Sequence, residues 1–413
     1  MNINDINYLH SHEELNPPFR KDKYTCSLGK IGKYWMYILL RGCVSSFFFL
    51  QRNYYSKVGK FDYVFFSVTG NNERALSPIA EKIGVLSKSF QLRDLPLRRV
   101  WFYAMVYSPI VFFRYLKYSG YLKKAYASEF MSFCLTYGYY FEARKILRQF
   151  DAKFLVVAND HSYPQRAFFR AAQSLNIKTA YVQHASVSEN FPPLEYDYAF
   201  LDGQESLDKY MANNKPCLSK VFLTGSPRFD IIKEIKNNEN NNSKIRLGIA
   251  INTVDTLEKI LCLIEKTQKA TNNTQIVLRP HPLMNKDFWS NFAVNNNCIY
   301  SDSKEENPFN FISNNDIFIA GETSFHLDVA LTGKISYYYN FSSGDILDHY
   351  GYLKSGLIKE LSESLIELNE TSVDVVNSKD RKELIQYYVA NYGTSDWGKS
   401  AELTALILTE NYE

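Results

Sequence analysis

The feature that most constrains the fold is a repeated unit in which a short apolar run of strand type is followed by polar residues and then by a helical pattern. Such runs occupy residues 61–69, 154–158, 179–182, 198–201 and 220–223, and again 245–251, 275–278 and 317–320. Short apolar runs bounded by turn residues are typical of strands buried in parallel sheets. Strands that alternate with helices predict an α/β fold in which helices cover a parallel sheet.

An asparagine-rich segment divides this pattern into two halves. Residues 234–244 read Glu-Ile-Lys-Asn-Asn-Glu-Asn-Asn-Asn-Ser-Lys, and a stretch with so few apolar residues cannot form a core of its own. We therefore predict two Rossmann-like domains whose parallel sheets face a cleft, at residues 1–235 and 245–378, joined by a linker at 236–244. The C-terminal helices at 379–413 are expected to pack back on the first domain. In the first domain, Pro78 is expected to begin the helix after the first strand.

The stretch 316–333 predicts an anion site in the second half of the chain. A strand at 317–320 ends at Gly321, and Thr323 and Ser324 supply hydroxyls where a helix would begin. Free backbone N–H groups and the positive end of a helix dipole favour an anion at such a position. The alternative is that the two hydroxyls only cap the helix, which residues of this type do routinely.

A second polar strand end lies about forty residues earlier, in the run Gln-Ile-Val-Leu-Arg-Pro-His-Pro at 275–282. Arg279 and His281 follow the strand at the edge where α/β sheets bind ligands. Pro280 and Pro282 stiffen the backbone there. A guanidinium and an imidazole beside a helix N-terminus would suit a diphosphate or a nucleotide monophosphate. The alternative is a histidine in an ordinary surface turn.

Composition narrows the class of protein. The chain has 413 residues, which is enough for two domains, and a formal net charge of +3, which is too small to indicate nucleic-acid binding. Six cysteines without a C-x-x-C pair argue against a zinc site or a disulfide framework. The polar N-terminus does not read as a signal peptide, so a cytoplasmic protein is expected.

Two segments of the first half mix aromatic, aliphatic and basic residues. Residues 34–50 are apolar apart from Arg41 but short for a membrane span, and residues 98–124 interleave aromatic rings with six Arg and Lys. Such helices suit contact with an anionic membrane face, which would make the protein peripheral on the inner membrane. They equally suit amphipathic core helices with a solvated basic edge, and the sequence leaves both interpretations open.

Four short motifs in this order resemble bacterial surface-polysaccharide transferases of GT-B fold. They are Gln-His-Ala at 183–185, Gly-Ser-Pro-Arg-Phe-Asp at 225–230, Arg-Pro-His-Pro at 279–282 and Gly-Glu-Thr-Ser-Phe-His-Leu-Asp at 321–328. The chain is similar in these motifs to CDP-glycerol glycerophosphotransferases, polysialyltransferases and capsule Kdo transferases. The similarity covers roughly residues 150–340. It departs from the family in the first domain, where Ala185 stands in place of a glycine.

The resemblance implies that the second domain binds the nucleotide donor, with CMP- or CDP-linked donors favoured and UDP- or GDP-sugars next. It implies contacts of His281, Thr323 and Ser324 with donor phosphate, and places Arg279, Arg228 and Glu322 nearby. The expected reaction is an inverting transfer in which a base deprotonates a hydroxyl of a saccharide or lipid-linked saccharide acceptor. His184, Asp160 and His161 are the candidate bases, and Glu189 is a further, lower-ranked candidate.

No Asp-x-Asp triplet occurs in the sequence, so neither a metal ion nor another cofactor is expected. Two other functions fit the same architecture. One is a nucleotide-sugar 2-epimerase, which needs paired carboxylates near the sugar. The other is a non-catalytic polysaccharide assembly factor.

Overall fold

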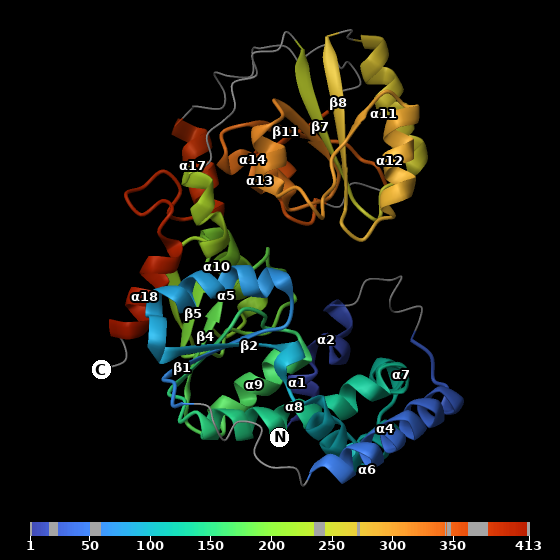
Figure 1. The fold of residues 1–413 in the computed structure, drawn as a ribbon, viewed down its shortest axis with the longest axis vertical. Coiled ribbons are helices and arrows are strands. Elements are labelled where there is room, and N and C mark those ends of the chain that lie inside the picture. Colours follow the sequence, from blue (N-terminus) through green and yellow to red (C-terminus); the bar gives the residue numbers. More distant parts are fainter. Residues whose placement is uncertain are drawn as a thin grey trace. The chain divides into compact units, whose positions relative to one another are not determined.

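The computed structural model describes residues 2–15, 24–49, 59–234, 244–270, 273–342, 344, 348–361 and 379–410. The chain forms two compact units (Figure 1), one of Met1–Arg228 with Lys399–Glu413 and the other of Phe229–Gly398. Of the two C-terminal helices, α18 (Ser400–Glu410) belongs to the first unit and α17 (Lys379–Tyr388) to the second. Residues 235–243, which make up nearly all of the predicted linker, lie outside the described residues.

The first unit is built on a six-stranded parallel sheet in the order β2-β1-β3-β4-β5-β6. Its strands are β1 (Tyr63–Ser67), β2 (Ser87–Gln91), β3 (Phe154–Val157), β4 (Lys178–Val182), β5 (Tyr198–Leu201) and β6 (Lys220–Leu223). Every residue of β1 and β3 is buried, as expected for central strands covered on both faces. The direction of strand order reverses between β1 and β3, and open α/β sheets bind ligands at such a switch point.

Helices cover both faces of this sheet. On one face, α5 (Gly70–Ile83) and α18 pack in a core that joins Phe65, Ile79 and Ala405. On the other face lie α8 (Phe130–Gln149) and α9 (Tyr163–Gln173), and beyond them α4 (Leu28–Phe49), α6 (Leu97–Lys117) and α7 (Gly120–Ser128). The short helices α1 (Ile3–Ile6), α2 (Tyr8–Ser11) and α10 (Gln204–Met211) complete this unit.

The prediction that Pro78 begins the helix after the first strand is wrong. Helix α5 begins at Gly70, because Thr69 and Asn72 form a reciprocal capping box there, and Pro78 lies inside the helix. The start of α5 is thus eight residues closer to the end of β1 than expected.

The second unit holds another six-stranded parallel sheet, in the order β12-β11-β10-β7-β8-β9. Its strands are β7 (Ile245–Ile251), β8 (Thr274–Pro280), β9 (Ile299–Tyr300), β10 (Ile317–Ala320), β11 (Ile335–Tyr338) and β12 (Lys359–Glu360). This is the order of dinucleotide-binding Rossmann domains, with the switch point between β7 and β10. The prediction of two Rossmann-like parallel-sheet domains is therefore confirmed.

Two cores sandwich the second sheet. On one side α11 (Leu257–Ala270) and α12 (Lys286–Asn295) pack against Ile249 and Ile276. On the other side α13 (Pro308–Ser313) and α14 (Phe325–Leu331) pack against Val277 and Phe318. The helix α15 (Tyr352–Ser355) joins α17 in a third apolar cluster.

Candidate functional site

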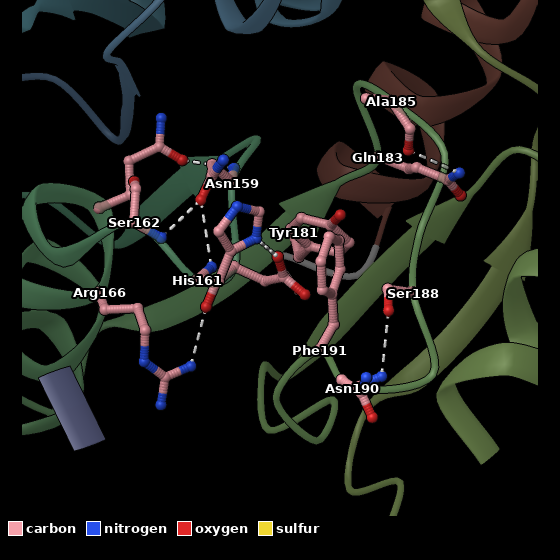
Figure 2. A network of polar contacts seen from close by, with 12 residues as sticks. Asn159, His161, Ser162, Arg166, Tyr181, Gln183, Ala185, Ser188, Asn190 and Phe191 are labelled. Carbon is pink, nitrogen blue, oxygen red and sulfur yellow. Dashed lines mark hydrogen bonds and ion pairs between the residues drawn. The ribbon is translucent and has the colours of Figure 1, made fainter. Parts of the chain in front are cut away.

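In the first unit, Asp160 and His161 form a hydrogen-bonded pair just after β3, beside the switch point. The His161 Nδ1 atom lies 2.9 Å from Asp160 Oδ1, and the Asp160 side chain is buried whereas His161 is partly exposed. The ring of His161 packs on Phe191, with centroids 4.4 Å apart. Figure 2 shows His161 at the centre of a polar network that includes Asn159 and Ser162. Asn159 Oδ1 accepts hydrogen bonds from the backbone N–H groups of His161 and Ser162, which fixes the turn.

The Asp160 carboxylate is held from its other side by Tyr210 on α10. The Tyr210 hydroxyl donates to Asp160 Oδ2 at 2.6 Å and lies 3.1 Å from the hydroxyl of Tyr181. Burial on its own would raise the pKa of Asp160, but the hydrogen bonds from His161 and Tyr210 and the charge of Arg166 outweigh it and lower that pKa. Asp160 is therefore an ionised, fully engaged carboxylate that orients the imidazole of His161.

Arg166 fastens this site to the N-terminal helix. Its guanidinium is fully buried and donates to the Asp160 backbone oxygen at 2.9 Å, to the Asp5 backbone oxygen at 2.6 Å and to Asp5 Oδ1 at 2.6 Å. Arg170 makes a second ion pair with Asp5. A buried arginine with this many partners is rigid, so Arg166 holds the turn that carries Asp160 against helix α1.

His184 follows β4, the strand next to β3. Burial lowers its pKa to about 4, and the charges of Asp160, His161 and Arg228 also act on it. Its Nδ1 atom is buried and has no hydrogen-bond partner in the described part of the chain. The structure thus brings the three predicted base candidates together. Of the two histidines, His161 has a carboxylate in hydrogen-bond contact, whereas no such contact of His184 is found among the described residues. Glu189 is exposed on the loop that follows.

Arg228 ends the first unit, after a turn in which Gly225 has a φ of +72°. Its positive charge contributes to the lowered pKa of His184. The neighbouring Gln183 is buried and structural, because its side chain bonds Ala185, Ser206 and Asp202.

In the second unit, the ends of β8, β7 and β10 lie side by side at one edge of the sheet. The backbone N–H of His281 donates to the Ile251 oxygen at 2.9 Å, and Asn252 Nδ2 donates to the Glu322 oxygen at 3.3 Å. Because β7 lies between β8 and β10, the ends of β8 and β10 are two strand spacings apart, roughly 10 Å. Asn252 directly follows β7, and its side chain bonds the segment after β10.

His281 is exposed, and its tautomer follows from one contact. The backbone N–H of Leu283 donates to His281 Nδ1 at 3.2 Å, which requires a lone pair on that nitrogen. In the neutral ring the proton is then on Nε2, where it can be donated to an anion.

Thr323 and Ser324 differ in their roles. Thr323 Oγ1 accepts from the N–H of Phe325, the first residue of α14, at 3.3 Å, so this hydroxyl satisfies one of the free N–H groups at the start of the helix. Ser324 is the residue before α14, but its side chain makes no capping bond, and no hydrogen bond of its hydroxyl is found among the described residues. Helix α14 has only seven residues, so its dipole is weaker than the sequence pattern suggested.

Glu322 and His326 shape the same edge. The backbone N–H groups of Tyr350 and His349 bond the Glu322 carboxyl group, whose pKa is nevertheless raised by burial. His326 is buried, and its ring nitrogens contact Ser336 Oγ at 2.5 Å and the Gly321 oxygen at 3.0 Å. Burial lowers the pKa of His326 to about 4, so this ring is a neutral structural tie that holds the Gly321 turn.

The guanidinium of Arg279 is bonded to other residues of the second unit and is not available at the C-terminal ends of the strands. It is buried, donates to Ser301 Oγ at 3.0 Å and to the Glu306 backbone oxygen at 2.7 Å, and lies over the Phe311 ring. Its charge is thus used to fasten the 301–306 segment, and we do not include it in the phosphate site.

Asp255 is a titratable residue at this edge that the sequence pattern did not single out. Its Oδ2 accepts from the Asn252 N–H at 2.7 Å, and burial raises its pKa to about 6. A Cβ on Gly321 would lie 3.2 Å from Asp255 Oδ1, a tight contact that glycine avoids. An Asn-x-x-Asp turn directly after the first strand of the sheet was the available signal.

Comparisons with known proteins bear on the fold. No protein-family model matches the chain, and no curated protein matches it by sequence. The chain is similar to the UDP-GlcNAc 2-epimerase of Neisseria meningitidis, solved with UDP-GlcNAc bound, at a TM-score of 0.54 and 13% identity over 84% of this chain and 100% of that one. A putative UDP-N-acetylglucosamine 2-epimerase from Listeria monocytogenes gives a TM-score of 0.52 and 12% identity over 86% and 97%.

The wall teichoic acid polymerase TagF gives a TM-score of 0.47 and 11% identity over 92% of this chain and 97% of that one, which is too low to support an argument. At such identities the similarities show the fold alone. That fold consists of two Rossmann-like domains of GT-B type, as predicted.

Proposed function

We propose that this protein is an inverting transferase that moves a glycosyl or alditol-phosphate group from a nucleotide-activated donor to a hydroxyl of a surface-polysaccharide acceptor. His161 is the general base, Asp160 orients it, and the strand-end edge of the second unit binds the nucleotide. No metal ion or other cofactor takes part in the proposed reaction.

The contact between Asp160 and His161 carries this proposal. An ionised carboxylate on Nδ1 holds the imidazole with its proton on that nitrogen and the lone pair on Nε2. Nε2 can then take the proton of an acceptor hydroxyl, and the resulting imidazolium is stabilised by the carboxylate. General-base assistance of this kind typically contributes about 10²–10⁴ in rate. His184 is the weaker candidate, because a pKa of about 4 leaves it a poor base at neutral pH.

The second unit supplies groups suited to a nucleotide that lies across β7. His281 Nε2–H and the Ser324 hydroxyl are two hydrogen-bond donors on either side of Asn252. The ends of the strands that carry them are roughly 10 Å apart, a span that suits a diphosphate with its ribose better than a single phosphate group. The Glu322 carboxyl group would repel phosphate, and we assign it to ribose hydroxyls, which donate hydrogen bonds. Developing charge on the leaving phosphate would be stabilised by these fixed donors.

The identity of the donor rests on the motifs that the sequence shares with CDP-glycerol and CMP-sugar transferases. These favour a CMP- or CDP-linked donor and a saccharide or lipid-linked saccharide acceptor. A 2-epimerase is the main rival, because solved 2-epimerases share the fold. Epimerisation at carbon needs groups that remove and return a proton on opposite faces. Both carboxylate oxygens of Asp160 are already engaged, by His161 and by Tyr210, which favours a base that acts on a hydroxyl.

The proposal is tested in two steps. The full-length protein is first screened by thermal shift with CMP, CDP, UDP and GDP, where a ligand at 100 times its dissociation constant stabilises by about 2.7 kcal/mol. The corresponding nucleotide-linked donors are then incubated with and without oligosaccharide acceptors. We expect nucleotide release that depends on the acceptor and is lost in His161→Gln. A free epimer formed without acceptor would identify an epimerase, and nucleotide binding without turnover would indicate an assembly factor.

A further inference from the structure

The outermost layer of the first unit is a pair of helices with an apolar exterior. Helix α9 packs on β3 and β4, α8 on α9, α6 on α8, and α4 on α6. Figure 1 shows α4 and α6 side by side at the end of this unit, away from its sheet. The two helices touch closely, since Trp35 Nε1 donates to Ser108 Oγ at 2.8 Å and a Cβ on Gly42 would clash with Met105. The facing sides of α4 and α6 therefore pack against each other.

The outer faces of α4 and α6 expose large apolar side chains in a regular pattern. On α4, Leu40 is 63% exposed and Phe113 on α6 is 68% exposed. The other exposed apolar residues of the pair are Leu28, Met36, Tyr37, Leu39, Val44, Leu97, Val106, Ile110 and Leu116. On α6, residues 106, 110 and 113 follow helical spacing along one face. An exposed apolar surface of this extent on a single helical layer marks an interaction site.

The charged residues of the segments that form this layer indicate what kind of partner it binds. Residues 24–61 and 95–128 contain no Asp or Glu, although the whole chain has 44 of them. The same two segments carry basic residues that include Lys33 on α4, Lys117 at the end of α6 and Lys124 on the adjoining α7, all exposed and without an ion pair in the described part of the chain. An apolar helix face on segments whose charged residues are all basic is the composition of helices that lie in the interface of an anionic bilayer.

We infer that the α4–α6 layer is a docking surface for an anionic lipid membrane, with the helices lying in the interface. No helix among the described residues is long and apolar enough to cross a bilayer, so the contact would be peripheral. A second copy of the chain is the less suitable occupant. A symmetric dimer through this face would bring two all-cationic surfaces together, and like charges there oppose association. Anionic headgroups instead neutralise the lysines while the apolar side chains enter the acyl boundary.

Flotation of the full-length protein with vesicles tests this inference. Vesicles of phosphatidylcholine alone are compared with vesicles that contain 30 mol% phosphatidylglycerol, at 50 and 500 mM NaCl. We expect binding to the anionic vesicles that weakens at high salt, because the Debye length shrinks. Removing one lysine near an anionic surface weakens binding by about fivefold, so Lys33→Gln/Lys117→Gln/Lys124→Gln should weaken it by about 100-fold.

Two further variants separate the apolar contribution from a general effect of exposed residues. Leu40→Gln/Phe113→Gln should reduce binding to anionic vesicles at least tenfold, since each side chain loses its transfer into the acyl region. The matched control is Leu218→Gln/Val294→Gln, which changes two residues that are 72% and 71% exposed elsewhere. It should bind like the parent protein. Circular dichroism checks that each variant is folded.

Three results would overturn the inference. One is equal binding of the parent to anionic and neutral vesicles, or none to either. Another is an equal loss of binding in the control variant. The third is a dimer in analytical ultracentrifugation that Leu40→Gln/Phe113→Gln converts to monomer, which would show that a second copy covers the face. None of these measurements uses enzymatic activity, so failure of the proposed transferase function would leave the test intact.

Discussion

Substituting Asp160 by asparagine tests the core of the proposed chemistry, because it changes a charge and hardly any volume. The new carboxamide would keep an oxygen for the Tyr210 hydroxyl but would turn an N–H donor toward His161 Nδ1. The imidazole would then carry its proton on Nε2 and lose its function as a base. We expect turnover with acceptor to fall by about 10²–10⁴.

The same substitution has a predictable effect on stability. A hydrogen bond to a charged group contributes about 1.5–3 kcal/mol, and one of the two is retained in part, so the free energy of unfolding should fall by about 1–2 kcal/mol. Because the pKa of Asp160 is lower in the folded state than in the unfolded chain, its stabilisation is present above pH 3.8 and lost as pH falls through the folded pKa. The difference between Asp160→Asn and the parent should therefore shrink between pH 7 and pH 3.

Urea unfolding at several pH values and steady-state kinetics with saturating donor measure the two effects. Tyr210→Phe is the matched control, since it removes one hydrogen bond to the same carboxylate but leaves the bond to His161. It should cost about 1.5–3 kcal/mol of stability, as a bond to a charged group, and less than tenfold in turnover. Turnover of Asp160→Asn within threefold of the parent would refute the assignment of His161 as an oriented base. So would an equal loss of turnover in the two variants.

Two further predictions concern the second unit, and a third concerns the reaction as a whole. Ser324→Ala should weaken nucleotide binding by about fivefold to tenfold in calorimetry, whereas Thr323→Ala, which removes only a cap, should lower the melting temperature with little effect on affinity; equal losses of affinity would contradict this division. The pKa of Asp255 is raised in the folded state, so ionisation of this carboxyl group destabilises the fold as pH rises from about 4 to about 6, and Asp255→Asn should gain about 1 kcal/mol at pH 7.5 but none at pH 4 in thermal unfolding. Pre-treatment with EDTA should leave turnover unchanged; its loss, restored by Mg²⁺, would contradict the metal-independent reaction.

Local pattern predicted eight of the twelve strands of the two sheets, but not β2, β9, β11 and β12, and not all of the roles at the strand ends. The strand runs and their polar exits are visible in the sequence because burial on two faces demands apolar residues and the turns demand Gly, Asn and Asp. The role of Arg279 was misread, because its partners Ser301 and Glu306 lie more than twenty residues away and no short motif encodes them. The role of Tyr210 was missed for the same reason, since its bond to Asp160 spans fifty residues.

Strand order distinguishes the polar segments that follow the strands. The segments after β3, β4, β8 and β10 looked alike in the sequence, yet of these four only those after β3 and β10 border a point where the order of their sheet reverses. On both sides of such a point the connecting helices lie on opposite faces, so the strand ends there stay uncovered and a ligand can approach the backbone. His161 and Ser324 occupy these two positions, whereas His184 and His281 stand one strand away from the reversal. Pairing of β1 with β3 and of β7 with β10 joins segments about ninety and seventy residues apart, which periodicity within a window cannot detect. If the ligand sites are set by topology in this way, nucleotide affinity should depend more on the β10 exit than on the His-Pro motif after β8, although the motif is the more conspicuous in sequence.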